Sequence, residues 1–306
     1  MHQRYIGFLF AAATLSGQET VIKVDVDLVN VFCSVRDKRG AYLKDLEKSH
    51  FTVLEDGKQQ EIRYFTRETD LPLTIGLLVD VSKSQENLIE IEKRAAAQFF
   101  EKMLRPKDMA FLISFGAEAE LLQDYTNSAR LLRQGLDGLR LSVPTGGLHP
   151  GPVPTSRMRG TILYDAVYLA AHEKLKSEVG RKVVVVITDG VDTGSRVKVQ
   201  EAIVAAHKSD VIIYSIYYAD TRYYGAGNDS DLKKMADETG GRVFHVGRNN
   251  TLDDIFRQIQ EEMRSQYLIG YSPVGGERSG AFRKLEIKTA DKDQKVLARK
   301  GYYASR

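Results

Sequence analysis

The sequence predicts an α/β protein in which a mostly parallel sheet is inserted into a small β-sandwich. Between about residues 70 and 266, apolar strand-like runs alternate with segments of helical period, a pattern that implies a parallel sheet with right-handed crossovers. Shorter strand patterns occupy both flanks, and neither flank has enough strands to bury its own apolar face. Because chain termini often lie close together, we expect the two flanks to form one sandwich.

The composition is that of an ordinary globular chain. Its 306 residues suffice for two or three modest domains with a dry core. Hydrophobic residues make up 42% and charged residues 28%, and 44 basic against 41 acidic side chains leave a net charge of +3. No basic stripe stands out, so nucleic-acid binding is not predicted. Cys33 is the only cysteine, which excludes an internal disulfide, and its strand context predicts a small core residue.

Residues 1–17 are typical of a secretory signal peptide, and we therefore expect a secreted or periplasmic protein. A short basic start, Met1–Arg4, precedes an apolar stretch over residues 5–15, and small residues allow cleavage after Ala13 or Gly17. The stretch is short for a transmembrane helix, and no later stretch reaches that length. A buried strand or helix start is the alternative interpretation of this segment.

Residues 18–69 are expected to supply the N-terminal strands of the sandwich. Residues 22–35 alternate with period two, which predicts a strand whose apolar face carries even-numbered residues such as Phe32. Residues 51–54 and 60–65 then form a hairpin around an Asp-Gly turn. The C-terminal strands are expected within residues 267–306, over 267–271, 282–288 and 296–303.

The inserted region, residues 70–266, alternates strands with helices. The expected strands are 73–79, 110–115, 119–122, 183–188, 211–217 and 242–246. The expected helices are 86–104, 128–139, 161–175, 197–209, 229–239 and 252–266. In the first helix Leu88, Ile91 and Ala95 recur at helical spacing, which predicts that they share its buried face. In such sheets, ligands bind beyond the carboxyl ends of the strands.

The most informative pattern is Asp80-x-Ser82-x-Ser84, which ends an apolar run typical of a buried strand. The turn into the following helix thus carries one carboxylate and two hydroxyls that can face one point. Hard divalent cations such as Mg²⁺ prefer oxygen ligands of this kind. Two later segments add weight, because Gly160–Asp165 opens a helix and Val183–Gly190 is a buried strand that ends in Asp-Gly.

In this order, the three segments resemble the metal-ion-dependent adhesion site of a von Willebrand factor A (VWA) domain. The resemblance covers about residues 70–266 and implies a Rossmann-like, doubly wound, mostly parallel sheet with helices on both faces. It also implies a metal that leaves one coordination position for a carboxylate of a partner protein. Carried over position by position, the metal ligands are Asp80, Ser82, Ser84, Thr161 and Asp189. Val81 stands where many members have glycine, but its side chain is not a ligand.

The flanks extend the likeness. The segments Val26–Val31, Leu54–Gln59 and Arg299–Tyr303 resemble the secreted bacterial VWFA-related family described from acidobacteria. This second resemblance supports the architecture and implies no settled biochemical activity.

The five oxygen donors fit Mg²⁺ best, with Mn²⁺ or Ca²⁺ as alternatives. Two carboxylates and three hydroxyls supply a charge of −2, which balances a divalent cation, and none of them is a soft-metal ligand. An incoming Asp or Glu would replace a water on the partly uncompensated cation. The alternative interpretation makes Ser82 and Ser84 helix N-cap residues and Asp189 part of a simple turn.

Further residues border the predicted site. Thr188 and Asp192 are candidates for residues that position the metal ligands without binding the metal themselves. Asp192 fits a plain turn residue equally well, and Asp165 fits an acidic residue at a helix start. The loop 145–154, rich in Gly and Pro, and the tyrosine-rich segment 218–225 lie on the same edge. Their candidate partner-binding residues are His149, Tyr223 and Tyr224. Disorder of the loop and simple packing of the tyrosines over the sheet are the alternatives.

No enzymatic motif competes with this site. The sequence has no Gly-x-Ser-x-Gly elbow and no phosphate-binding Gly-x-x-x-x-Gly-Lys, and His172-Glu173 lacks the second histidine of a zinc protease. We therefore expect a non-enzymatic binding protein whose Mg²⁺ coordinates an acidic residue of another protein. Two alternatives stay open: an assembly module of the cell envelope with a purely structural metal, and a metal-assisted hydrolase.

Overall fold

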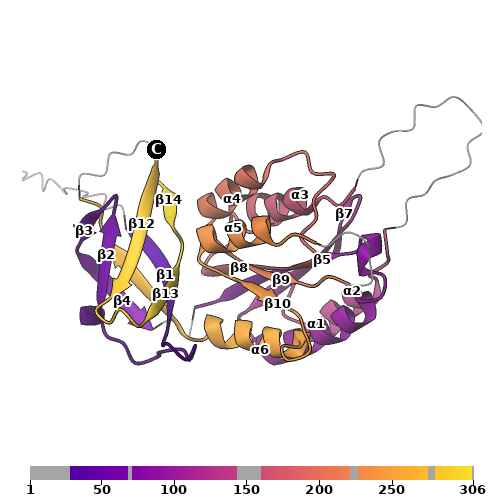
Figure 1. The fold of residues 1–306 in the computed structure, drawn as a ribbon, viewed down its shortest axis with the longest axis horizontal. Helices are drawn as coiled ribbons and strands as arrows, with labels where there is room; N and C mark the ends of the chain where they lie inside the picture. The colour runs from indigo at the N-terminus through magenta and orange to yellow at the C-terminus, as the bar shows by residue number, and fades with distance from the viewer. Residues whose placement is uncertain (1–27, 68–70, 143–159, 221–226, 275–279, 305–306) are drawn as a thin grey trace, which may run out of the picture.

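The computed structural model describes residues 28–67, 71–142, 160–220, 227–274 and 280–304. Two parts lie side by side, a sheet covered by helices and a smaller part made of strands (Figure 1). The predicted signal peptide lies outside the described residues. Within the described ranges, no helix is both long and apolar enough to cross a membrane.

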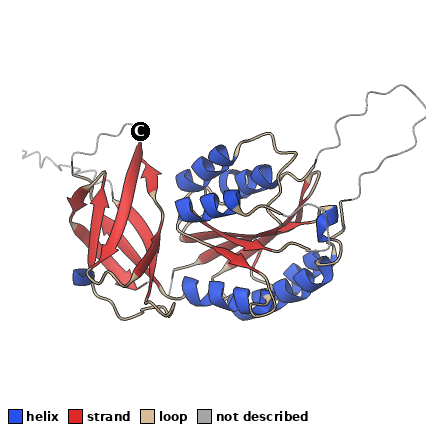
Figure 2. Cartoon of the chain, in the orientation of Figure 1, coloured by secondary structure: helices blue, strands red, loops and turns tan. Residues whose placement is uncertain are grey.

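The larger part is built on a six-stranded sheet with the order β10-β9-β8-β5-β6-β7. Neighbouring strands are parallel except β7, which pairs antiparallel with β6 at the edge, as predicted. The strands are β5 (Leu73–Asp80), β6 (Met109–Phe115), β7 (Ala119–Thr126), β8 (Arg181–Thr188), β9 (Val211–Tyr217) and β10 (Val243–His245). The central strands β5 and β8 are buried throughout, because helices cover both faces of the sheet (Figure 2).

The helices divide between the two faces. One face carries α1 (Ile89–Met103), α2 (Ala129–Asp137) and α6 (Leu252–Met263). The other carries α3 (Leu163–Tyr168), the π-helical turn η3 (Leu169–Lys174), α4 (Val199–Lys208) and α5 (Ser230–Thr239). Two 3-10 helices are η1 (Lys48–His50) and η2 (Lys83–Gln85). This arrangement confirms the predicted α/β architecture.

The buried face of α1 matches the predicted one except at one position. Leu88 and Ala95 are buried as expected, but Ile91 is 41% exposed and Glu92 is buried in its place. Residues 88, 92, 95 and 99 follow one another at spacings of four, three and four, so they share one side of the helix. The prediction for Ile91 is therefore wrong by one position.

The smaller part is a β-sandwich of two four-stranded sheets, ordered β13-β1-β11-β4 and β14-β12-β2-β3. As predicted, its strands come from both flanks: β1 (Val29–Arg36), β2 (Phe51–Glu55), β3 (Lys58–Gln60), β4 (Ile62–Arg67), β11 (Gln266–Tyr271), β12 (Phe282–Thr289), β13 (Lys295–Ala298) and β14 (Gly301–Tyr303). The chain leaves the sandwich after β4 and re-enters it at β11. These two strands pair with each other, and Arg67 lies opposite Tyr267.

Three strand predictions need correction. The sandwich core takes the odd-numbered side of β1, including Val31 and Cys33, whereas Phe32 packs against the core of the larger part. The strand β1 is therefore covered on both sides, so the alternation of apolar residues does not show which side faces the sandwich core. The predicted strands 60–65 and 296–303 each break and continue in the other sheet, as β3 to β4 and as β13 to β14.

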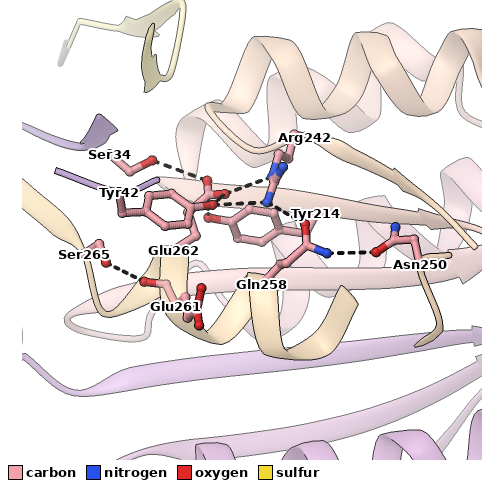
Figure 3. Close-up of polar contacts among 9 residues, drawn as sticks. All are labelled: Ser34, Tyr42, Tyr214, Arg242, Asn250, Gln258, Glu261, Glu262 and Ser265. Atoms are coloured by element: carbon pink, nitrogen blue, oxygen red, sulfur yellow. Dashed lines mark hydrogen bonds and ion pairs between the residues drawn. The ribbon is translucent and has the colours of Figure 1, made fainter. Parts of the chain in front are cut away.

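Glu262, near the end of α6, joins the two parts (Figure 3). Its buried carboxylate accepts hydrogen bonds from the hydroxyls of Tyr42 at 2.6 Å and Tyr214 at 3.0 Å. The guanidinium of Arg242 pairs with it at 3.0 Å, and Ser34 of β1 donates at 3.4 Å. Because Ser34 and Tyr42 belong to the sandwich flank, this network fixes α6 against the sandwich.

Candidate metal site

The first and last of the predicted ligands lie at the carboxyl edge of the six-stranded sheet. Asp80 is the last residue of β5, and Asp189 follows β8, the strand that pairs with β5. Asp80 is 0% exposed and Asp189 is 6% exposed. Two acidic residues from adjacent strand ends therefore share one buried corner.

The carboxylate of Asp80 is held by two neighbours. The Thr188 hydroxyl donates to Oδ2 at 2.6 Å, and the backbone N–H of Ser82 donates to Oδ1 at 2.9 Å. The pKa of Asp80 is raised to about 6, chiefly by burial and further by the charge of Asp189, while the hydrogen bonds from Thr188 and Ser82 oppose the rise. Burial outweighs these hydrogen bonds, so the ionised form of Asp80 is less stable in this site than in water.

Ser82 and Ser84 turn their hydroxyls toward each other. Their Oγ atoms share a hydrogen bond of 2.9 Å in the turn between β5 and α1. Ser82 occupies the N-cap position of η2, yet its side chain makes no capping hydrogen bond. Ser82 therefore has the N-cap position that the alternative supposed, but its hydroxyl does not cap the helix.

Thr161 lies on a loop that is tied to the loop after β8. Its carbonyl accepts hydrogen bonds from the N–H groups of Thr193 and Gly194, both at 3.0 Å. The next residue, Ile162, donates its N–H to the carbonyl of Gly116, just beyond β6, at 2.9 Å. These backbone contacts hold Thr161 at the same edge of the sheet as the two carboxylates.

Asp189 is fixed by the turn that follows β8. The N–H of Val191 donates to its Oδ1 at 3.1 Å. Gly190 has a φ of 78°, and a Cβ there would lie 2.1 Å from the carbonyl oxygen of Asn228, so this position requires glycine. The Asp-Gly pair is thus a turn, as the alternative supposed, and the same turn carries a buried acidic residue.

The neighbouring polar residues divide into two roles. Thr188 supports the first carboxylate directly, as the hydrogen bond described above shows. Asp192 instead accepts a hydrogen bond from the N–H of Tyr164 in the first turn of α3 at 3.1 Å. Asp165, also in that turn, accepts one from the N–H of Arg196 at 2.9 Å. Asp192 and Asp165 therefore order loops, as their turn and helix-start interpretations predict.

Two buried polar residues behind the site are not predicted from the sequence. Gln85 donates from Nε2 to the carbonyl of Tyr218 at 3.3 Å. Glu92 is 1% exposed, and among the described residues neither of its carboxyl oxygens has a hydrogen-bond partner. Burial, reinforced by the charge of Asp80, raises the pKa of Glu92 well above its usual value, which favours its neutral form. One sequence feature could have indicated that Glu92 is buried. It lies four positions after Leu88, on a helix that packs on the sheet.

The charge of this corner is unmatched. In the described part of the chain, Asp80 and Asp189 form no ion pair with a lysine or arginine, and the donors that reach them are neutral. The same residues contain no group of three or more His, Cys, Asp or Glu that could hold a metal. A cation at this edge would therefore depend on hydroxyl oxygens as well as on the two carboxylates.

The three predicted partner-binding residues, His149, Tyr223 and Tyr224, lie outside the described residues. The beginning of the tyrosine-rich segment is described. There the side-chain amide of Asn87 donates to Asp220 at 2.9 Å, which ties the segment to the start of the α1 region.

These features define a class of protein: an α/β domain with helices on both faces of a mostly parallel sheet, and with buried carboxylates and facing hydroxyls at its carboxyl edge. Residues 154–258 match the family model of the von Willebrand factor type A domain. The chain therefore contains a VWA domain, as the sequence motifs predict.

Two solved structures are similar to part of this chain. Proximal thread matrix protein 1 from the mussel byssus, in a form with a zinc-occupied MIDAS motif, has 17% identity and a TM-score of 0.50 over 70% of this chain and 50% of that chain. This chain thus spans half the length of the mussel protein. An aerotolerance-related membrane protein from Bacteroides fragilis has 17% identity and a TM-score of 0.47 over 62% of this chain and 98% of that chain. No curated protein sequence matches the chain.

Proposed function

We propose that the protein is a non-enzymatic, metal-dependent binding module of the adhesion type, secreted or periplasmic. In this proposal one Mg²⁺ coordinates an Asp or Glu of a partner protein, and His149, Tyr223 and Tyr224 border the contact. The metal ligands are Asp80, Ser82, Ser84, Thr161 and Asp189.

The observation that carries the proposal is the unmatched negative charge beside two facing hydroxyls. Asp80 and Asp189 are buried without a cationic partner among the described residues. A buried carboxylate without a counter-charge is costly, and a bound divalent cation removes that cost. Partial neutralisation also leaves the cation able to attract one further carboxylate.

The donor set supports a hard divalent cation such as Mg²⁺, because its donors are carboxylate and hydroxyl oxygens. The hydroxyls of Ser82 and Ser84 share a hydrogen bond of 2.9 Å, so they lie close enough to bind one cation together. The zinc in the mussel protein's motif supports a divalent metal in more general terms.

Titration calorimetry of the chelator-treated full chain with Mg²⁺ and Mn²⁺ tests the metal. We expect one site, and we expect Asp80→Ala to weaken it at least about 100-fold, because loss of a ligand exceeds loss of an outer-shell partner. Asp237→Asn, which removes an exposed carboxylate on α5, should leave the affinity unchanged. Equal affinity in the Asp80→Ala variant would refute the site.

A second experiment separates partner binding from a structural metal. A peptide with a single glutamate, and the same peptide with glutamine, are added to the Mn²⁺-loaded chain while water proton relaxation is measured. We expect the glutamate peptide alone to displace a water from Mn²⁺ and lower the relaxation rate. No difference between the peptides would favour the structural alternative, and Asp80-dependent turnover of an ester or phosphate substrate would favour the hydrolase.

A further inference from the structure

A cavity of about 470 Å³ lies where the VWA domain meets the β-sandwich. It opens at the amino edge of the six-stranded sheet, opposite the candidate metal site. The sandwich contributes Phe32 of β1 and Leu268 of β11, and the VWA domain contributes Lys182 and Val211 from the starts of β8 and β9. The wall is mostly apolar, and the volume falls in the range of about 300–1,000 Å³ that is typical of small-molecule sites.

Lys182 is a buried, charged group in this wall. It is 8% exposed, and in the described part of the chain its ammonium forms neither a hydrogen bond nor an ion pair. Burial and the charge of Arg299 lower the pKa of Lys182 below its usual value, and the charges of Asp210 and Glu178 oppose this effect. Because a buried ammonium without a counter-ion is costly, an anion that enters the cavity gains a strong interaction.

The other charged groups of the wall are matched, neutral or partly solvated. Asp210 pairs with Arg299, which also donates to the carbonyl of Asn30 at 2.8 Å. His207 is 4% exposed, and burial lowers its pKa to about 4, so its ring is uncharged near neutral pH. Glu178 is half-buried, and its carboxylate repels any negative charge that does not contact Lys182 directly. The wall thus favours a ligand with one negative charge.

We propose that this cavity binds a small monocarboxylate with an apolar body, whose carboxylate pairs with Lys182 and whose body packs between the sandwich and the VWA domain. A dicarboxylate would bring its second charge near Glu178 and Asp210. An alcohol or amine of the same length would leave Lys182 unmatched. Because the ligand contacts both parts of the molecule, its binding stabilises their interface and raises the thermal unfolding midpoint.

Titration calorimetry of the full chain with octanoate tests the site. We expect one equivalent to bind with a Kd between about 10 µM and 1 mM, which is reasonable for a ligand of this size. Octanol, octylamine and the dicarboxylate suberate should each bind at least about tenfold more weakly, because each loses the single charge-assisted contact or adds repulsion. Binding of octanol as tight as that of octanoate would overturn the proposal, and so would the absence of octanoate binding.

Variants locate the contact. Lys182→Met keeps the apolar stem of the side chain but removes its charge, and it should weaken octanoate binding at least about tenfold. Lys44→Met, which changes an exposed lysine after β1, is the matched control and should bind octanoate like the wild type. A folded Lys182→Met protein that binds octanoate at wild-type affinity would overturn the assignment.

A measurement on the wild-type chain keeps the test valid if Lys182→Met does not fold. Octanoate should slow acetylation of Lys182 by an amine-reactive reagent and leave acetylation of Lys44 unchanged, as read by peptide mass spectrometry. If octanoate binds but does not protect Lys182, the carboxylate lies elsewhere and the proposal is wrong. Neither experiment involves the metal edge, so failure of one proposal leaves the other standing.

Discussion

The two ends of strand β8 bury opposite charges. At its amino end Lys182 lines an apolar cavity, and just beyond its carboxyl end Asp189 joins Asp80 in a buried corner. Residues 182 and 189 are seven positions apart, about 23 Å along a strand at about 3.3 Å per residue. At that distance neither charge neutralises the other. One sheet therefore has an edge suited to an anion and an edge suited to a cation.

Glu262 represents the opposite situation, a buried charge that the protein itself matches. Its carboxylate receives the Arg242 guanidinium and three hydroxyl groups, whereas Lys182 and Asp80 have no counter-ion among the described residues. A matched charge contributes to the interface of the two parts. An unmatched charge costs stability until a ligand arrives. Removal of the two kinds of charge should therefore change the free energy of unfolding in opposite directions.

Glu262→Gln should have the largest effect. The variant leaves the Arg242 guanidinium without its counter-charge, which should lower the free energy of unfolding by about 3–5 kcal/mol. Denaturant unfolding followed by circular dichroism measures the change. Glu261→Gln, an exposed neighbour on the same helix, should stay within about 0.5 kcal/mol of the wild type. If the two variants were equally stable, the distinction between matched and unmatched charges would lose its basis.

The buried histidine beside the cavity should make the protein sensitive to acid. The pKa of His207 is about 4 in the folded protein, because burial and the Arg299 charge disfavour its cation, and about 6.5 in an unfolded chain. The unfolded chain therefore binds a proton first, and stability falls as the pH drops from about 6.5 to about 4, by up to about 3 kcal/mol. His207→Phe keeps a ring beside Phe282 and Tyr303. Its unfolding free energy should fall less over the same interval, and parallel curves for the two proteins would contradict the assignment.

Asp80→Asn should produce a smaller effect of the opposite sign to Glu262→Gln. The pKa of Asp80 is about 6 in the folded protein, against 3.8 for an unperturbed aspartate. The unfolded chain therefore loses its proton at lower pH, and the metal-free protein loses stability as the pH rises from about 4 through 6. In chelator at pH 7, the variant should therefore be more stable than the wild type by about 2 kcal/mol, and the gain should disappear near pH 4. Thermal and denaturant unfolding at both pH values measure it. Destabilisation at pH 7 would show that the protein already matches this charge.

The sequence is sufficient to predict the α/β fold and the edge that carries Asp80 and Asp189, because local apolar runs and the direction of the chain determine both. The VWA family is indicated by the resemblance of the three motif segments. It does not predict which side of β1 faces the sandwich core. Val31 and Phe32 are both directed into apolar surroundings, so alternation carries no information there. The strand patterns over 60–65 and 296–303 continue across a change of sheet, since both sheets of the sandwich share one core.

The surroundings of the charges are harder to predict than the motif. The partners of Glu262 come from distant segments, and Ser34 is 228 residues away in the sequence. The buried position of Glu92 depends on which side of α1 meets the sheet, and Ile91 competes for the same place. The cavity at Lys182 forms only where the sandwich meets the VWA domain, so no local pattern indicates it.

The pairing of β4 with β11 has a consequence for how this chain can be rebuilt. Arg67 and Tyr267 face each other across adjacent strands, and a two-residue turn is enough to connect facing antiparallel strands. Excision of the whole insert and closure of the gap by such a turn would leave every strand of the host in its sheet. The junction is equally a graft point, where any module whose ends lie about one strand spacing apart, about 4.8 Å, can be spliced in.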